Sequence, residues 1–367
     1  MDNNSNKEQQ LIADTNNKRK MPHMIKVGFA LVIIFALGIG LIPTQTAGLF
    51  DAMLDRVMGI VPLFLTGTVG MAIIVGCLVG RILERLGFSD ALVRIFLPAT
   101  KLMRVNPTLI IPAIYNIIGD QQAMSKITVG TLLKGGASRD ELKIAVATMV
   151  QAPNNFSTLM LAILCIAGAG VNVLLILVAG IILPLLITPI ILRNTIWRDA
   201  SYIPLESLPC FITDTDPLST VFDSAREGVQ LAYLLVLPSV AAVFAFIGAL
   251  EYLGAWKYIM DFFGFICDHL WIDPDLGVQI IFISPTLAVA NLSETFANFD
   301  PRIVVGSTLL ALSGLPFVSL VGQLPVIWST ESNNKIRKGE VIVAGWIGIL
   351  LKFIYTFIIV SIMNIFM

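Results

Sequence analysis

The sequence has little charge and few of the residues that bind metals or form disulfides. Of its 367 residues 13% are charged, and the only histidines are His23 and His269. A zinc site needs several nitrogen or sulfur ligands close together, which two distant histidines do not supply. The cysteines show no Cys-x-x-Cys spacing, so neither a metal site nor a disulfide framework is indicated. They are Cys77, Cys165, Cys210 and Cys267.

Signatures of catalysis and of nucleotide binding are also missing. The chain has no P-loop of the form Gly-x-x-x-x-Gly-Lys-Ser/Thr, no Gly-x-Ser-x-Gly and no His-Glu-x-x-His. A net charge of −1 gives no electrostatic reason to expect a nucleic acid partner. We therefore expect a protein that is not an enzyme and has no resident cofactor or metal.

Long apolar runs, by contrast, are abundant. Hydrophobic residues make up 56% of the chain, and about 20 apolar residues suffice to cross the hydrocarbon layer as a helix. This composition predicts an all-α polytopic membrane protein. The runs are 27–43, 57–80, 144–167, 171–192, 229–250 and 341–366.

The N-terminal part of the chain is polar. Residues 1–26 predict a disordered tail, and the basic group at 18–20 precedes the first apolar run. Because Lys and Arg are enriched on the cytoplasmic side, we expect a cytoplasmic tail and a retained first span and loop over 27–56. A signal peptide is the alternative, but no small-residue cleavage pattern follows Pro43.

A polar segment at 147–158 interrupts an otherwise apolar run. Pro153 lacks an N–H and clashes with the preceding turn, which frees backbone carbonyls near Gln151. At membrane depth such a break is tolerated only inside protein or beside a water-filled cavity, and transporters commonly build binding sites from it. The alternative is a plain proline kink in which Asn154 and Asn155 join helices by hydrogen bonds.

Four short matches occur in the same order in both halves of the chain. They are LERLG at 83–87 with LEYLG at 250–254, NPTL at 106–109 with DPDL at 273–276, VGTLL at 129–133 with VGSTLL at 305–310, and QAP at 151–153 with QLP at 323–325. We therefore expect one repeat over 57–195 and another over 229–367, joined by a cytoplasmic connector over 196–228. Chance similarity between apolar segments is the alternative.

The distribution of basic residues indicates that the two repeats are inverted. Each basic segment of one repeat matches a segment of the other with little positive charge. The pairs are 81–104 with 248–271, 134–143 with 313–316, and 335–338 with 167–170. Since cytoplasmic loops are enriched in Lys and Arg, the pattern predicts two inverted-topology repeats.

In this topology each repeat has a span, an interfacial helix, a re-entrant hairpin, a broken span and a last span. The expected interfacial helices are 89–104 and 255–270, and the expected hairpin tips are 119–122 and 291–294. Asp120 and Glu294 are ionisable groups within apolar sequence, which by default indicates a function. The alternative is that the tips reach the opposite water interface.

The hairpins, the basic loop 134–143 with the small-residue-rich helix after it, and the two-copy plan resemble the nucleoside-recognition or Gate domain family. That family includes spore maturation proteins A and B, the ethanolamine permease and the concentrative nucleoside transporters. The resemblance covers about residues 56–367. It implies two fused Gate copies, with re-entrant hairpins and broken helices, in a bacterial inner membrane. The Gln-Thr-Glu signature of the nucleoside transporters has only a partial counterpart, SET at 293–295.

These features predict a secondary transporter of a small polar solute, nucleoside-like or an amine, driven by Na⁺ or H⁺. The expected solute ligands are Gln121, Gln122, Gln151, Asn154, Asn155, Ser157, Asn291, Ser293 and Gln323, with Asp120 and Glu294 coupling the ion. The expected partners are the solute and the bilayer, and a homo-oligomer is left open. The alternative is a non-transporting membrane component in envelope or spore maturation, in which these side chains only join helices.

Overall fold

The computed structural model describes residues 23–59, 61–65, 68–118, 121–203, 216–313 and 319–366. Within these ranges every element of regular secondary structure is a helix, so the prediction of an all-α protein is confirmed. Most of the predicted disordered tail lies outside the described residues, as does Asp120.

Several helices are long and apolar enough to cross a membrane, as the composition predicts. They are Met24–Leu41, Val173–Thr195 and Lys338–Met363, and a fourth if a bent pair is counted as one span. That pair is Val240–Tyr252 followed by Ala255–His269, with a bend of 106° between them. The protein is therefore a helical membrane protein.

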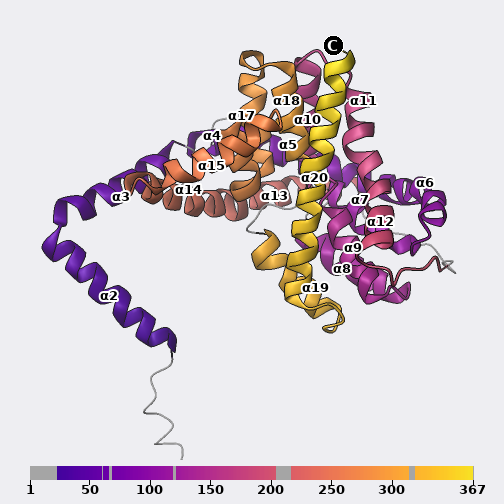
Figure 1. The fold of residues 1–367 in the computed structure, drawn as a ribbon, viewed down its shortest axis with the longest axis horizontal. Helices are drawn as coiled ribbons and strands as arrows, with labels where there is room; N and C mark the ends of the chain where they lie inside the picture. Colours follow the sequence, from indigo (N-terminus) through magenta and orange to yellow (C-terminus); the bar gives the residue numbers. More distant parts are fainter. Residues whose placement is uncertain are drawn as a thin grey trace, which may run out of the picture.

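The N-terminal helices extend away from the body of the molecule (Figure 1). Helix α2 (His23–Leu41) has none of its apolar window buried, and it begins inside the predicted tail. Helix α3 (Pro43–Met58) occupies most of the predicted loop and crosses the predicted boundary at residue 56. It lies along α14 (Leu237–Tyr252), where Gly248 leaves no room for a side chain against Ala52.

The connector between the predicted repeats differs from the expected loop. Helix α13 (Pro217–Val229) runs without interruption through the π-helix η3 (Gln230–Val236) into α14, so the boundary at 228 falls inside one long helix. Helix α13 packs on α5 (Thr68–Arg85), where Arg81 donates to Glu227. Asp216 begins α13 as an N-cap, a role for which short polar residues are favoured.

Two amphipathic helices have matching ends. Gly87 and Gly254, both with positive φ, precede α6 (Phe88–Met103) and α15 (Ala255–His269). After them Arg104 and Trp271 both have φ of 55°. Both pairs are 167 residues apart, since 254 − 87 = 167 and 271 − 104 = 167. Glycine suits a left-handed position because it has no Cβ.

The centre of the molecule is formed by short helices from both halves of the chain (Figure 1). The first half contributes η1 (Pro107–Ile110), α7 (Ile111–Ile118), α8 (Gln121–Lys134), α9 (Arg139–Met149) and α10 (Phe156–Gly168). The second contributes α16 (Pro274–Val278), η4 (Gln279–Ile283), α17 (Pro285–Thr295), α18 (Pro301–Ala311), η6 (Ser319–Gln323) and α19 (Leu324–Glu331). Helix α8 packs against α19, and α10 packs against α17, so the halves interlock.

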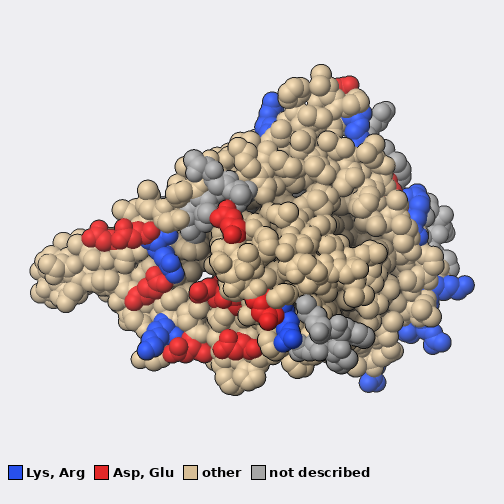
Figure 2. Space-filling view, turned by 90° about the horizontal axis from the view of Figure 1, so that it is seen from above, with Lys and Arg blue, Asp and Glu red and all other residues tan. Residues whose placement is uncertain are grey.

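The last spans of the two halves flank this centre. In the first half α11 (Val173–Leu177), the π-helix η2 (Val178–Ile182) and α12 (Leu183–Thr195) follow one another without a break. In the second half α20 (Lys338–Phe366) contacts both α9 and α18. The surface shows broad areas without charged residues between several small charged groups, and such uncharged areas are expected where lipid is the solvent (Figure 2).

Candidate functional site: a junction of helix breaks

The predicted interruption of the apolar run 144–167 is present. A capping box between Ser138 and Glu141 starts α9, which ends at Met149, and α10 begins at Phe156. Just after α9 the amide of Gln151 donates to the carbonyl of Thr148, a tighter turn than in an α-helix. The chain between the two helices therefore leaves carbonyls without helical partners, as a proline break should.

Gln151 is completely buried at this break, with 0% of its surface exposed. Its Nε2 donates to the carbonyl of Ala147 at 3.1 Å and to that of Gly348, on α20, at 2.9 Å. Its Oε1 has no hydrogen-bond partner among the described residues. A buried acceptor left without a partner costs about 1–3 kcal/mol, so it marks a place where a function or a ligand should be sought.

Lys352 lies at the same junction and is 1% exposed. Its Nζ donates to the carbonyl of Gln151 at 3.2 Å and to the carbonyl of Gly180 at 2.9 Å. Gly180 lies in the π-helix η2, and four residues later Pro184 has no N–H to donate to it in α-helical register. One side-chain nitrogen therefore donates to a carbonyl beside the break at Pro153 and to a carbonyl whose α-helical donor is missing at Pro184.

A second polar cluster connects the first break to a break in the other half of the chain. Asn155 caps α10, because its Oδ1 accepts the amide of Thr158 at 2.8 Å. Its Nδ2 donates to Thr286 Oγ1 at 3.1 Å, and the hydroxyls of Thr158 and Thr286 are 2.7 Å apart. Thr286 follows the extended residue Ser284, which separates η4 from α17. The two breaks thus meet inside the protein.

Asn154 and Ser157 flank this cluster. The Oδ1 of Asn154 accepts from Thr158 Oγ1 at 2.9 Å, so Asn154 belongs to the cluster. Ser157 instead packs against Gly76 of α5, and its hydroxyl is 3.4 Å from the carbonyl of Ile73. Its position is that of a helix-joining residue.

The other predicted ligands in the second half of the chain lie in helices, in α17 and at the end of η6. The residues 291–294 were expected at a hairpin tip, but they lie within α17, and the chain breaks at Ser284 instead. Asn291 donates to Gln279 at 2.8 Å and Ser293 to the carbonyl of Ala290 at 2.7 Å. Glu294 and Gln323 are exposed.

The first predicted tip can be followed only in part. Gln121 and Gln122 lie in the first turn of α8, but their side chains are outside the described structure, as is the whole of Asp120. Sequence reasoning missed Asn116, on α7, which is 1% exposed. Neither Nδ2 nor Oδ1 of Asn116 has a partner among the described residues.

Sequence reasoning also missed Lys352, although a signal was present. Lys352 is the only charged residue in the apolar run 341–366. The rule that an ionisable residue within a span suggests a function applies to it as directly as to Asp120.

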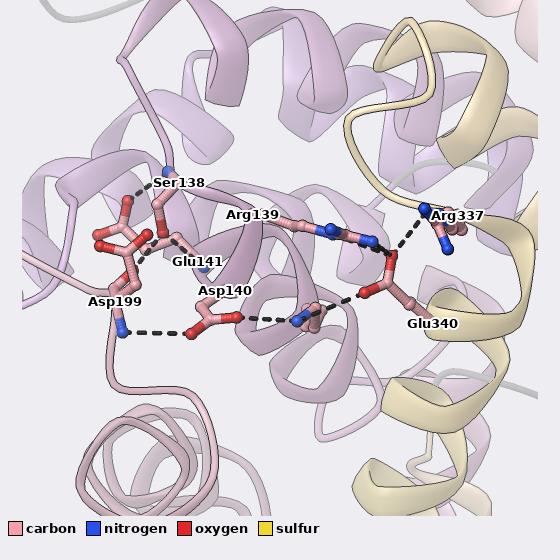
Figure 3. Close-up of polar contacts among 8 residues, drawn as sticks. Ser138, Arg139, Asp140, Glu141, Asp199, Arg337 and Glu340 are labelled. Carbon is pink, nitrogen blue, oxygen red and sulfur yellow. Dashed lines mark hydrogen bonds and ion pairs between the residues drawn. The ribbon is translucent and has the colours of Figure 1, made fainter.

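Charged side chains hold α9 and α20 together at one end of this junction (Figure 3). Arg139 donates to Glu340 at 2.8 Å, and Lys143 lies between Asp140 at 2.8 Å and Glu340 at 3.5 Å. Asp140 also accepts the amide of Asp199 at 3.2 Å, which attaches the start of the connector. The network fixes where the two helices start relative to each other.

No group of three or more metal-binding side chains occurs in the described part of the chain. An apolar hollow of about 410 Å³ lies at the bend between α14 and α15 and has almost no polar lining. No protein-family model matches the chain, and neither a curated protein nor a solved structure matches it. The architecture therefore defines a class, a helical membrane protein with broken helices at its centre.

Proposed function

We propose that this protein is a secondary transporter of a small polar solute, and that its site lies where the breaks at 150–155 and at Ser284 meet. The observation that carries the proposal is the bond of Asn155 to Thr286, which joins the two breaks inside the protein. Broken helices are tolerated at membrane depth where they surround a cavity or a ligand, and half-helix ends suit polar groups.

The proposed arrangement is two inverted-topology repeats with re-entrant hairpins. Matching ends of α6 and α15 at an offset of 167 support it, as does the exchange of contacts by which α3 packs on α14 while α13 packs on α5. The pairing of α8 with α19 and of α10 with α17 is a further exchange of the same kind. Such reciprocal contacts are what a pseudo-two-fold axis between two copies would produce.

One sequence match is out of step with this arrangement. VGTLL at 129–133 lies in α8, whereas VGSTLL at 305–310 lies in α18. By element order α18 corresponds to α9, and α17 corresponds to α8. The repeat is therefore supported by the order of elements and not by this match.

The proposed driving force is an H⁺ or Na⁺ gradient, and Asp120 and Glu294 remain proposed coupling groups. A membrane carboxylate can bind a cation or carry a proton. The proposed solute ligands are the polar side chains at and near the breaks, with Asn154 and Asn155 first among them. A nucleoside-like compound or an amine fits the amides and hydroxyls available there.

A thermal-shift screen of the purified full-length protein tests the proposal. Nucleosides, amines and amino acids are tested with and without Na⁺. A ligand at 100 times its dissociation constant stabilises the folded form by about 2.7 kcal/mol. We expect at least one hit that Asn155→Ser abolishes, because Ser still caps α10 but lacks the amide. Asn172→Ser, at the exposed cap of α11, is the matched control and should keep the hit.

A non-transporting membrane component in envelope or spore maturation is the second candidate. The packing of Ser157 against α5 favours it, since that hydroxyl joins two helices. If no solute of the panel stabilises the protein and Asn155→Ser is only less stable, the result would support this candidate. It would also contradict a transport site at the breaks.

A further inference from the structure

We infer that the junction of α9, η2 and α20 is a cation-binding site, and that the ammonium group of Lys352 occupies it as a tethered cation. The site consists of the carbonyl of Gln151 just after α9 and the carbonyl of Gly180 in η2. The chemical class that it takes is a small primary ammonium ion, which offers three N–H donors to oxygen acceptors.

The carbonyls are available for reasons that do not involve Lys352. The C-terminal end of α9 carries partial negative charge, and the chain after it leaves the helix before Pro153. Four residues after Gly180, Pro184 has no N–H to donate to the carbonyl of Gly180. Gly180 also lies in a π-helix, a form often found at functional sites. The break after α9 and the π-helical distortion of the span 173–195 therefore direct two acceptors to one point.

Among the described residues, no carboxylate binds the Nζ of Lys352. In the part of the chain that the structure describes, the hydrogen-bond partners of Lys352 are these two carbonyls, which use two of its three donors. An isolated buried charge is costly, so a lysine that was only filling space would be poorly suited to this position. Gln151, which supplies one of these carbonyls, also has a buried side-chain Oε1 without a partner among the described residues.

The charged groups on the surrounding elements are engaged elsewhere or exposed. The elements packed on α20 are α9, α12, α18, α19, η2 and η6. Glu141 accepts the amides of Asn106 and Ser138, and Arg193 donates to backbone carbonyls near the connector. Arg302 lies beside Asp300, and Glu331 is exposed. The π-helices η2 and η6 carry no charged residue.

A tethered cation at this junction also bears on ion coupling, and this step rests on the proposed function. In many transporters freed carbonyls at broken helices coordinate a soluble cation. Here the carbonyls are occupied by a side chain of the protein itself. A tethered ammonium removes the need for Na⁺ at this junction. Of the two proposed driving gradients, H⁺ and Na⁺, this favours H⁺.

Chemical rescue tests the site on the full-length protein in detergent, with thermal unfolding as the readout. Lys352→Ala empties the site and should lower the unfolding temperature by several degrees. Methylammonium, which donates hydrogen bonds and fits the vacancy, should restore part of the loss. Tetramethylammonium has the same charge but no donor, and it should restore nothing. Wild-type protein should respond equally to both salts.

Lys335→Ala is the matched control. Lys335 also donates to a backbone carbonyl, that of Ala137 at 2.6 Å, but its side chain is exposed outside the spans. The Lys335→Ala variant should show only a small fall in unfolding temperature, and methylammonium should not change that fall. Lys352→Met fills the space without a cation, so it should be destabilised and not rescued.

Two outcomes overturn the inference: no selective recovery of Lys352→Ala by methylammonium, or a Lys352→Met variant as stable as wild type. If Lys352→Ala does not survive extraction, the comparison of the two salts is made during extraction, with the yield of monodisperse protein as the readout. No solute enters this test. A protein that transports nothing would still show the rescue, so failure of the site and failure of the proposed function are distinguishable.

Discussion

Gly348 is a residue at which α20 lies close to the broken span. A Cβ at this position would lie 2.8 Å from the carbonyl of Ala147 and 2.8 Å from a methyl group of Val150. Its own carbonyl accepts a hydrogen bond from the side-chain Nε2 of Gln151. The absence of a side chain thus permits the contact on which the junction depends.

We expect Gly348→Ala to destabilise the protein by about 1–3 kcal/mol, because the helices must separate to admit the methyl group. Gly339→Ala is the control on the same helix, since a Cβ there meets nothing within 4 Å. It should be neutral or stabilising by up to about 1 kcal/mol. Unfolding temperatures of both variants in detergent measure the difference, and equal values would contradict the close contact.

Thr286 is the residue through which the two breaks are joined. Replacing it by Val keeps the shape but removes the hydroxyl that binds Asn155 and Thr158. Because those buried partners lose a hydrogen bond, we expect a loss of about 1–3 kcal/mol. Thr195→Val, at an exposed hydroxyl bonded within its own helix, should cost less than about 0.5 kcal/mol. Chemical unfolding of both variants decides whether the join contributes stability.

At the scale of elements, the docking of α13 on α5 depends on how α13 begins. The carboxylate of Asp216 accepts the amide of Ser219 at 3.0 Å, and this hydrogen bond lowers the pKa of Asp216 below its usual range. Further along α13, Thr220 accepts from Arg85 at 2.6 Å. The cap therefore fixes the start of a helix that α5 contacts.

This cap predicts a pH dependence. A carboxyl group with a lowered pKa in the folded state contributes stability above its unfolded pKa, near pH 4, and loses it as pH falls through the folded value. Asn caps a helix at any pH, so wild type should lose stability relative to Asp216→Asn as pH falls below about 4. Unfolding temperatures measured from pH 7 to 3 test the sign. A constant difference between the two proteins would contradict it.

How far the elements follow from sequence depends on what determines each one. The apolar runs and the break at Pro153 follow from composition and from the chemistry of proline, and both are found. The helical state of 217–229 is decided by packing on α5, which polarity alone does not reveal. Likewise a break at Ser284 needs no unusual residue besides the Pro285 after it, so 291–294 was the wrong place to expect the turn.

At the scale of the whole molecule, the inverted arrangement can be tested by accessibility. Arg94 on α6 and Asp261 on α15 are both exposed, and they differ by the repeat offset, since 261 − 94 = 167. In a Cys210→Ser background, we expect an impermeant thiol reagent applied outside cells to label Asp261→Cys and not Arg94→Cys. Permeabilised cells should label both, which controls for reactivity. Labelling of both positions from the same side would exclude inversion.

Which residues form the candidate site could be predicted only in part. Gln151, Asn154 and Asn155 follow from their place beside Pro153, and the structure places them at the break. Thr286 and Gly180 could not be named, because their roles come from contacts across 131 and 172 residues of chain. Long-range pairing of this kind depends on how the two halves interlock, and no local pattern encodes it.

The buried lysine of α20 has a consequence for biosynthesis. A lysine at the centre of a span costs about 2.5–3.5 kcal/mol during insertion at the translocon. The carbonyls that bind it belong to residues synthesised 172 and 201 positions earlier. Helix α20 therefore enters a membrane that already contains the two carbonyls that accept from Lys352. We expect its charge to favour integration only when the first half has assembled, so that the insertion of α20 depends on that assembly.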